Sequence, residues 1–521
     1  MGTTEQINTY TRIPPFIEIM DSTLRDGEQT NGVSFLPHEK LMIAKMLLSG
    51  IDADRVEVAS ARVSEGEKDA VTMICRYASK IGKLRKVEVL GFVDGTISVD
   101  WIASCGCKVM NLLAKGSLKH CKGQLNKTVK EHIRDIEGVL EYAGQQGIDV
   151  NLYLEDWSNG MKDNPEYVYE MLDSLTTKNV KRFMLPDTLG VLNPLQVVEY
   201  MRKMVKRYPN THFDFHAHND YDLAVSNSLA AALSGAKGLH VTVNGLGERC
   251  GNAPLASVQV ILKDQFHAKT SIREERLNDI SRLVEGYSGI AIAPNQPIVG
   301  ENVFTQVAGV HADGDNKANL YSNALVPERF GRKREYALGK TSGKANIDKN
   351  LRELGLELTA EQTLKVAQRI TELGDRKKFV TQEDLPYIVS DVLKHNVPEE
   401  KVRLVSYMVS SAYGLKPVAS VKVEINGNQY EAEAMGDGQY DAFVKALRKI
   451  YKNSLNRTFP ILANYSVSIP PGGRTDALVQ TVITWRNADK VIKTRGLDAD
   501  QTESAIKATL KMLNIFEDIN T

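Results

Sequence analysis

The chain has 521 residues, of which 42% are hydrophobic and 25% are charged, and its formal net charge is zero at pH 7. This length allows a large buried core and predicts more than one domain. The balanced charge, without any block of five or six like charges, argues against a nucleic acid or an acidic membrane surface as a partner.

The N-terminal sequence and the cysteines bear on localisation. No apolar run is long enough to span a bilayer, and the first residues lack the charged start and apolar core of a signal peptide. The five cysteines are an odd number scattered along the chain, which is typical of reduced thiols in a reducing compartment. We therefore expect a cytoplasmic protein without a membrane partner.

Short apolar strands alternate with amphipathic helices, such as those expected at residues 37–49, 129–145 and 223–233. A strict alternation of this kind predicts parallel strands covered by helices. Eight βα units in about 250 residues favour a closed (β/α)8 barrel, and a doubly wound open sheet is the alternative. The expected strands span residues 16–21, 55–60, 87–93, 109–114, 150–155, 182–186, 212–216 and 239–244.

Active sites of such barrels lie at the C-terminal ends of the strands, where this chain carries two histidines. In His216-Ala217-His218, alternate side chains of a strand face the same side. With Asp26, which follows the first strand, they form an oxygen and nitrogen donor set that suits Zn, Mn, Co or Fe. The amide of Asn252 follows the last strand. The alternative is a pair of strand-end histidines satisfied by hydrogen bonds.

Arg25 precedes the candidate ligand Asp26 directly. A fixed cation at this position would stabilise an oxyanion that develops on a metal-bound carbonyl. Arg25 is therefore a catalytic candidate, and the alternative is a salt bridge that closes the mouth of the barrel.

Three glycines, Gly245, Gly247 and Gly251, follow the last expected strand. Their spacing is not GxGxxG, and a dinucleotide fingerprint would follow the first strand of a βαβ unit. We therefore expect no dinucleotide site. The glycines either let the backbone approach a ligand or form a tight βα turn.

Beyond the barrel we expect a helix at 273–288, a connection near 294–297, a basic run at 329–334 and helices at 361–373 and 382–395. The basic run is typical of a solvated face, with steering of phosphates as a second interpretation. The expected domains are a catalytic domain (1–290), linker subdomains (291–400) and a C-terminal α+β domain (401–521).

The C-terminal domain contains two similar blocks. The first is expected to run strand, strand, helix at residues 418–425, 429–435 and 439–451. The second repeats that order with a further strand at residues 464–469, 477–486, 491–497 and 501–513.

Four segments resemble signatures of the α-isopropylmalate, citramalate and homocitrate synthases, and the stretches TLRDGEQTNGVSF and YLEDWSNG look most like the citramalate synthases. The resemblance implies a metal-dependent barrel that joins acetyl-CoA to an α-keto acid by a Claisen-type condensation and then hydrolyses the thioester. The segments are residues 21–30 (DSTLRDGEQT), 216–220 (HAHND), 244–252 (NGLGERCGN) and 309–314 (GVHADG).

This resemblance also implies roles for individual residues. Arg25 would stabilise the developing alkoxide, Thr188 would hold the keto-acid carboxylate, and Glu155 would be the acid/base near the reacting methyl group, whose proton is only weakly acidic. The metal, Zn, Mn, Mg or Co, would be bound by Asp26, His216 and His218 with Asn252 nearby. A homodimer with shared active sites is implied, because family members insert a segment into the partner's barrel that here contains His311, Asp313, Asn319 and Tyr321.

Three side chains bear on the identity of the keto acid. Leu90, Leu113 and Tyr153 would make a small apolar pocket that resembles those of citramalate synthases, which use pyruvate for isoleucine synthesis without threonine. Filling space excludes a larger substrate by steric means. We therefore favour pyruvate over the 2-oxoisovalerate of 2-isopropylmalate synthases. The alternative is that these residues only pack the barrel.

The C-terminal blocks look like the family's regulatory domain, which implies feedback inhibition by isoleucine or leucine. The alternative is a dimerisation domain without an effector. The loops that resemble effector-binding loops contain Gly436, Asp437 and Gly438 in the first block and Asp476 and Ala477 in the second. Two other classes remain open: a metal-dependent carbon–carbon lyase or aldolase, and a non-catalytic amino-acid-binding protein.

Overall fold

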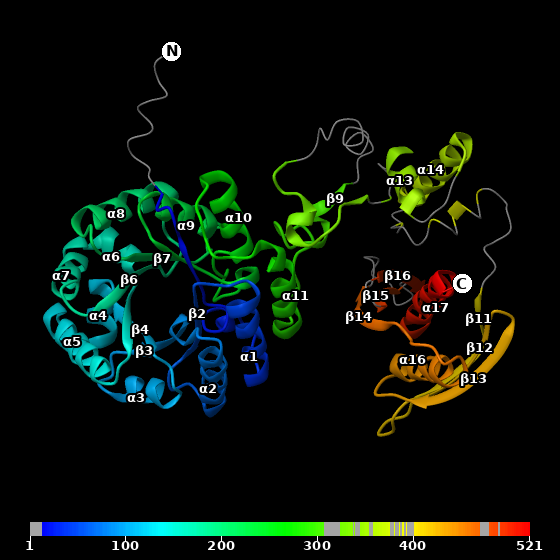
Figure 1. Cartoon of the computed structure of the whole chain (residues 1–521), viewed down its shortest axis with the longest axis horizontal. Helices are drawn as coiled ribbons and strands as arrows, with labels where there is room; N and C mark the ends of the chain where they lie inside the picture. Colours follow the sequence, from blue (N-terminus) through cyan, green and yellow to red (C-terminus); the bar gives the residue numbers. More distant parts are fainter. Residues whose placement is uncertain are drawn as a thin grey trace, which may run out of the picture. The chain divides into compact units, whose positions relative to one another are not determined.

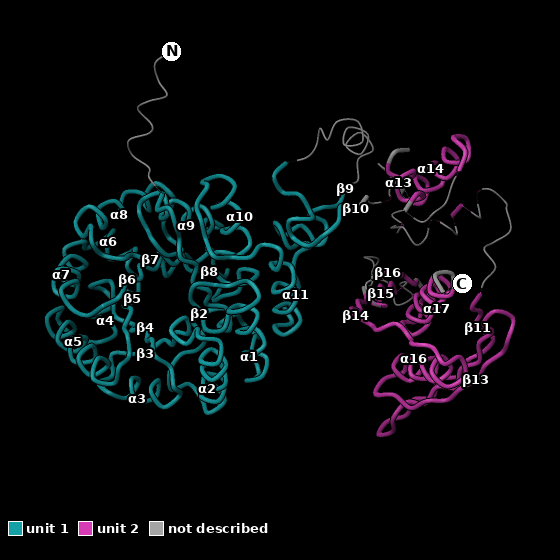
Figure 2. The backbone as a smooth tube through the Cα atoms, viewed as in Figure 1, with its two compact units in different colours: residues 1–305, 322–334 teal, residues 306–321, 335–521 magenta. Residues whose placement is uncertain are grey.

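The computed structural model divides the chain into two compact units (Figure 2). Unit 1 contains residues 1–305 and 322–334, and unit 2 contains residues 306–321 and 335–521. In the part that the structure describes, no helix has the length and apolar character needed to cross a bilayer. The described residues are 13–306, 323–336, 338, 344–353, 358–375, 380, 385, 388–389, 392, 401–468, 479–487 and 490–520.

Unit 1 is built around a closed barrel of eight strands that pair in chain order, with β8 returning to β1 (Figure 1). All eight pairings are parallel. The (β/α)8 prediction is confirmed, and the open doubly wound sheet is wrong. The strands are β1 Glu18–Asp21, β2 Arg55–Ser60, β3 Val87–Phe92, β4 Val109–Lys115, β5 Asp149–Glu155, β6 Val180–Asp187, β7 Phe213–Ala217 and β8 Gly238–Val241.

The eighth strand is shorter than predicted. It ends at Val241, and a single 3-10 turn, Val243–Gly245, follows it. Asn244 in this turn has φ 59°, a left-handed conformation that an extended strand cannot contain. The chain therefore turns three residues before the predicted end.

Helices surround the strands in Figure 1, as the βα alternation predicts. On α2 the buried residues Ala70, Ile74 and Ala78 recur every four residues, so one face of the helix packs inward. The expected helix at 37–49 splits into α1 and a π-helical turn, Met46–Gly50. The helices are α1 Pro37–Lys45, α2 Glu65–Lys80, α3 Ile97–Ser104, α4 Leu118–Leu125, α5 Val129–Gln145, α6 Trp157–Asp163, α7 Pro165–Leu175, α8 Pro194–Arg207, α9 Ala224–Leu233, α10 Leu255–Phe266 and α11 Leu277–Ser288.

The two faces of the barrel strands differ in chemistry. On β2, Val56 and Val58 belong to the large core between strands and helices, whereas Arg55 and Glu57 make buried polar contacts with β3 and β4. Because successive side chains of a strand point to opposite sides, the polar residues share the inner face. The barrel interior is therefore polar over much of its height.

The segment from residue 323 to residue 334 belongs to unit 1, where Arg329 makes a bidentate ion pair with Glu274 (2.7 and 2.8 Å). The rings of Phe304 and Phe330 stack with centroids 5.7 Å apart. Arg332 donates hydrogen bonds to the carbonyl oxygens of Gly300 and Glu301. Arg329 and Arg332 thus hold the protein together, and the prediction of a merely solvated basic face is wrong for both. The short strands β9 Thr305–Gln306 and β10 Glu335–Tyr336 form a two-stranded sheet.

Unit 2 contains two three-stranded antiparallel sheets, each followed by a helix, with one shared hydrophobic core. A first strand, β11, was not predicted. The predicted helix at 382–395 lies mostly outside the described residues. The elements are α13 Lys344–Glu353, α14 Ala360–Asp375, β11 Val402–Ser410, β12 Val418–Ile425, β13 Asn428–Met435, α16 Gln439–Lys449, β14 Ile461–Ser468, β15 Val479–Asn487, β16 Lys490–Asp498 and α17 Gln501–Asn520.

Candidate metal centre at the barrel mouth

A tight turn after β1 presents Arg25 and Asp26. The carbonyl oxygen of Ser22 accepts hydrogen bonds from the backbone N–H groups of Arg25 (3.2 Å), Asp26 (2.8 Å) and Gly27 (3.1 Å). The hydroxyl of Thr23 accepts a bond from Val243 N (2.8 Å), which ties the turn to the segment after β8. The turn is therefore fixed at the C-terminal end of the barrel.

Asp26, His216 and His218 form a buried cluster there. Oδ2 of Asp26 lies 3.1 Å from Nε2 of His216 and 3.9 Å from Nε2 of His218. One ligand atom from each residue lies within 4.8 Å of those of the other two. These are the three residues that the sequence predicts as metal ligands, and the fold brings them together.

The polar atoms of this cluster suit a cation. Oδ1 of Asp26 and Nδ1 of both histidines are buried with no hydrogen-bond partner among the described residues. Burial alone would raise the pKa of Asp26, but Arg25, His216 and His218 outweigh it and hold that pKa well below its ordinary value. Burial, followed by the proximity of His216, lowers the pKa of His218 to about 3. An ionised carboxylate beside a neutral imidazole is the form in which both bind a divalent metal.

Asn252 lies beside the cluster through an isolated β-bridge to His218. Its Nδ2 donates to Leu246 O (3.2 Å), while its buried Oδ1 has no partner among the described residues. A Cβ on Gly251 (φ +82°) would lie 1.9 Å from Gly245 O, and one on Gly247 would lie 2.2 Å from Asn252 Nδ2. These glycines are thus required by the packing of the turn itself, as the tight-turn interpretation predicts.

Arg25 is held against the cluster by three partners. Its Nε donates to Glu57 Oε2 (2.7 Å), its second guanidinium nitrogen donates to the Tyr153 hydroxyl (3.3 Å), and the first lies 3.3 Å from Asp26 Oδ2. The ion pair with Glu57 is the salt bridge of the alternative interpretation. Arg25 forms this salt bridge and at the same time lies directly beside the candidate metal ligands.

Glu155 and Thr188 lie at the same rim, at the end of β5 and just after β6. Glu155 forms an ion pair with Lys115 at the end of β4. The Thr188 hydroxyl oxygen accepts a bond from Asp156 N (2.9 Å), so its own proton can be given to another acceptor. Among the described contacts, no hydrogen bond or ion pair joins either side chain to the three clustered ligands.

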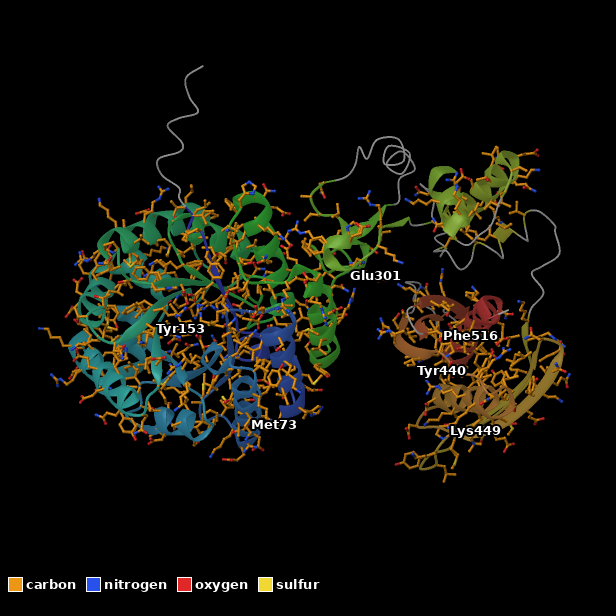
Figure 3. The ribbon with its side chains drawn as sticks, viewed as in Figure 1. Met73, Tyr153, Glu301, Tyr440, Lys449 and Phe516 are labelled. Atoms are coloured by element: carbon orange, nitrogen blue, oxygen red, sulfur yellow. The ribbon has the colours of Figure 1, made fainter. Side chains whose placement is uncertain are left out.

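The predicted pocket residues come together. Leu90, Tyr153, Met20 and Met184 form a small buried cluster apart from the main core, with Leu113 packed against it. The Tyr153 ring lies 6.2 Å from the His216 ring, between centroids, so the cluster adjoins the candidate metal centre. Figure 3 labels Tyr153 among the barrel strands. The two methionines were not predicted.

The predicted residues of the C-terminal loops and of the inserted segment lie either in unit 2 or outside the described residues. In the first C-terminal loop, Asp437 is exposed and pairs with Lys416 (2.8 Å), and Gly436 N donates to Pro417 O (3.0 Å). Gly438 is the residue before α16. The others, His311, Asp313, Asn319, Tyr321, Asp476 and Ala477, lie outside the described residues.

The sequence reasoning missed the polar side chains beneath the cluster. Glu57 holds Arg25, and Asn111, Asp214 and His240 continue the buried hydrogen bonds through the barrel. A usable signal was present, because each is a polar residue with an apolar neighbour on either side in a barrel strand, on the face given by alternation.

Fold and cluster together define a class: a (β/α)8 barrel with a buried Asp/His/His set at its mouth. A family model described as HMGL-like matches residues 16–284, a homocitrate synthase post-HMGL domain-like model matches 298–378, and a LeuA allosteric (dimerisation) domain model matches 379–517. The chain belongs to the HMGL-like family. This family is metal-dependent, and the chain contains the corresponding buried Asp/His/His group.

Relatives of known name span nearly the whole chain. An (R)-citramalate synthase from Methanocaldococcus jannaschii is 33% identical over 96% of this chain and 99% of that protein. A 2-isopropylmalate synthase from the same organism is 34% identical over 96% of this chain and 95% of that protein. Among solved structures, a hydroxymethylglutaryl-CoA lyase from Pseudomonas aeruginosa matches 54% of this chain and 95% of that chain, with 20% identity and a TM-score of 0.48.

Proposed function

We propose that the chain is an (R)-citramalate synthase, an acyltransferase that condenses acetyl-CoA with pyruvate and hydrolyses the thioester to citramalate and CoA. Family membership and near full-length similarity to such enzymes support the reaction class. Identity alone does not choose the keto acid, because the two M. jannaschii relatives are 33% and 34% identical to this chain. The choice depends on the pocket.

The observation that carries the choice is the apolar cluster beside the candidate metal centre. Leu90 is 6% exposed and Tyr153 is 3% exposed, and Met20 and Met184 pack with them. A side chain larger than a methyl group would have to displace these residues, which costs packing in a dense interior. This favours pyruvate, with 2-oxoisovalerate as the second candidate substrate.

We assign the metal to Asp26, His216 and His218, with Asn252 adjacent, and the buried clustering of the three side chains supports this assignment. A divalent metal at such a site supplies Lewis-acid polarisation of a substrate carbonyl. Arg25 stays a cation with its guanidinium beside Asp26 and stabilises negative charge on the same oxygen. The metal is Zn, Mn, Mg or Co, as the family resemblance implies.

Glu155 and Thr188 complete the assignment within the barrel. Glu155 removes a proton from the acetyl methyl group, with Lys115 as its ion-pair partner. Thr188 donates its hydroxyl proton to the keto-acid carboxylate, because its oxygen already accepts from Asp156 N.

The remaining sites belong to a proposed homodimer. His311, Asp313, Asn319 and Tyr321 would enter the partner's barrel, and isoleucine or leucine would bind at loops that include Gly436 to Gly438 and Asp476 with Ala477. The match of residues 379–517 to a LeuA allosteric (dimerisation) domain supports this. We propose the domains 1–290, 291–400 and 401–521. The first boundary lies between the matched families that end at 284 and begin at 298, whereas the match to the LeuA domain already begins at residue 379, within the proposed linker.

The direct test is CoA release from acetyl-CoA by the purified protein with a divalent metal. Pyruvate, 2-oxobutyrate, 2-oxoisovalerate and 2-oxoglutarate are offered separately. The highest kcat/KM is expected with pyruvate. A preference for 2-oxoisovalerate would make the chain a 2-isopropylmalate synthase, and the absence of CoA release with all four would favour a lyase.

A further inference from the structure

The hydroxyl of Tyr153 lies between Arg25 and a buried His–Asp pair. It is 3.3 Å from the guanidinium of Arg25 and 3.0 Å from Nδ1 of His240. On its other side, His240 places Nε2 3.1 Å from Oδ2 of Asp214. Tyr153, His240 and Asp214 are all buried and come from β5, β8 and β7. A chain of hydrogen bonds therefore runs from Asp214 to the cation beside the candidate metal ligands.

The donors and acceptors fix the direction of each hydrogen bond between Asp214 and Arg25. Asp214 also receives an ion pair from Arg55 and lies 3.0 Å from His212 Nε2, so three donors surround one carboxylate. Arg55, a permanent cation, forms a buried ion pair with Asp214, which keeps this carboxylate ionised. An ionised carboxylate only accepts hydrogen bonds, so Nε2 of His240 carries a proton.

The protonation of the other nitrogen of His240 follows from its surroundings. Arg25 can only donate, so it uses the tyrosine oxygen as its acceptor, and Nδ1 of His240 is the acceptor that the described contacts offer to the Tyr153 hydroxyl proton. A neutral imidazole that carries its proton on Nε2 has only a lone pair on Nδ1, so Nδ1 can accept a hydrogen bond but cannot donate one. The Tyr153 hydroxyl must then donate to Nδ1, and its oxygen is left to accept from Arg25.

We propose that His240 is a positioning residue for Arg25, acting through Tyr153: it takes the hydroxyl proton of Tyr153 and so turns the tyrosine oxygen toward the guanidinium. The inference rests on the proposed function only for its kinetic consequences. Tyr153 has no hydroxyl proton to give to substrate, so it is not a catalytic acid, and its hydroxyl serves to hold Arg25.

Arg25 is also held from the opposite side. Glu57 accepts from Arg25 and from Asn111 (2.8 Å), and Asn111 also donates to Glu88 (3.0 Å), which accepts from Arg55. Because Arg55 pairs with Asp214, the contacts close into a single ring. Such a ring sets the orientation of Arg25 before substrate binds, which is the condition for electrostatic stabilisation at low reorganisation cost. The ring runs Arg25, Glu57, Asn111, Glu88, Arg55, Asp214, His240, Tyr153 and back to Arg25.

The first test reads the tautomer of His240 and does not depend on activity. The protein is labelled with ¹⁵N-histidine, loaded with Zn, and the imidazole signals are recorded by long-range ¹H–¹⁵N correlation. The His240 signals are assigned by their loss in His240→Asn. We expect a neutral ring with the proton on Nε2 and none on Nδ1. A proton on Nδ1 would overturn the proposal.

The second test separates positioning from packing. His240→Leu removes the acceptor, whereas in His240→Asn the side-chain oxygen can take the place of Nδ1. We expect kcat/KM for the keto acid to fall about 10- to 100-fold in His240→Leu, the size of one lost hydrogen bond to a charged group. Activity should be largely retained in His240→Asn. Zinc affinity, measured by calorimetry, should be unchanged in both.

A double-mutant cycle decides whether Tyr153 transmits the effect. In a Tyr153→Phe background, His240→Leu is expected to cost no further activity, because the link is already broken. Additive losses, or equal losses in His240→Leu and His240→Asn, would show a structural role and overturn the proposal. Inactivity of the wild-type protein with every keto acid would instead contradict the proposed function, and the tautomer would still decide the present inference.

Discussion

The Nε atom of Arg25 donates a 2.7 Å hydrogen bond to Oε2 of Glu57, a carboxylate on the inner face of β2. Glu57 also accepts from the Ser22 hydroxyl (2.7 Å) and from Asn111 (2.8 Å). Burial opposes ionisation of Glu57, but Arg25 and these donors lower its pKa overall. A buried anion thus fixes the cation that stands beside the candidate metal ligands.

Replacement of Glu57 by glutamine is expected to lower kcat/KM about 100-fold. The amide would turn an NH₂ group toward partners that are all donors, and the loss of a charged hydrogen bond costs about 1.5–3 kcal/mol. Metal affinity should stay within a few-fold of wild type, because Asp26, His216 and His218 are untouched. Steady-state kinetics and calorimetric metal titration measure the two effects.

A matched control is Glu67→Gln. Glu67 pairs with the buried Lys40 (2.6 Å), and its contacts among the described residues do not include Arg25 or the cluster. This variant should lose stability while it keeps kcat. If Glu57→Gln and Glu67→Gln lowered kcat equally, Glu57 would have no special relation to Arg25.

Asp26→Asn is expected to weaken metal binding by at least about 100-fold, since loss of even an outer partner of a metal ligand costs 10- to 100-fold. The amide removes the negative charge while it keeps the shape of the side chain. Metal content after dialysis is the measurement. Asp94→Asn, at an ion pair with Arg62 (2.6 Å), serves as the control and should retain metal. Full metal content in Asp26→Asn would mean that the cluster is not the metal site.

The barrel and its cluster were predictable because both depend on local patterns. Each strand is a short apolar run, and the predicted strand limits agree closely except at β8. His216 and His218 lie two residues apart at the end of a strand, so alternation alone places them on one side. Asp26 could be added because the fold puts all strand ends at one rim.

The remaining features depend on contacts between distant residues or on weak patterns. Arg329 belongs to a basic run that looks solvated, yet Glu274, which pairs with it, lies 55 residues away in the sequence. In β11 the inward positions are Val402 and Leu404 and then Tyr407 and Val409, because a bulge between Leu404 and Ser406 shifts the register and interrupts the alternation. The ring through His240 and Asp214 required knowledge of which strands are neighbours across the barrel.

Gly251→Ala is expected to reduce metal affinity and kcat/KM together. Its Cβ would lie 1.9 Å from Gly245 O, so the turn that carries Asn252 must move. Gly82→Ala is the control, because Gly82 also has a positive φ (+70°) but a Cβ on it would meet no atom of the described residues within 4 Å. It should cost about 1 kcal/mol of stability from backbone strain and leave metal binding unchanged. If both variants lost metal affinity and kcat/KM equally, the close approach of a Cβ to Gly245 O would not be the cause of the loss.

Leu113→Ala is expected to raise the kcat/KM for 2-oxoisovalerate relative to pyruvate about tenfold. Leu113 packs against the pocket cluster, and room for two extra methyl groups is worth about 1.6 kcal/mol at 0.8 kcal/mol per carbon. Leu112→Ala is the matched control, because Leu112 points into the main core from the same strand. It should cost about 2–5 kcal/mol of stability without changing the preference. An unchanged preference for pyruvate over 2-oxoisovalerate in Leu113→Ala would mean that Leu113 only packs the barrel.

Acid should unfold the protein partly through His132, a buried residue whose Nε2 accepts a hydrogen bond from Lys115 N (3.0 Å). Burial lowers the pKa of His132 to about 4, so the unfolded chain takes up the proton first as the pH falls below about 6.5. Its contribution to stability, about 3 kcal/mol at most, is therefore lost between about pH 6.5 and pH 4. His132→Gln keeps an acceptor but cannot be protonated, so its acid midpoint, followed by tryptophan fluorescence, should lie at lower pH than that of wild type. The exposed His38, replaced by glutamine, should leave the midpoint where it is. A midpoint that does not move in His132→Gln would assign the acid sensitivity to other groups.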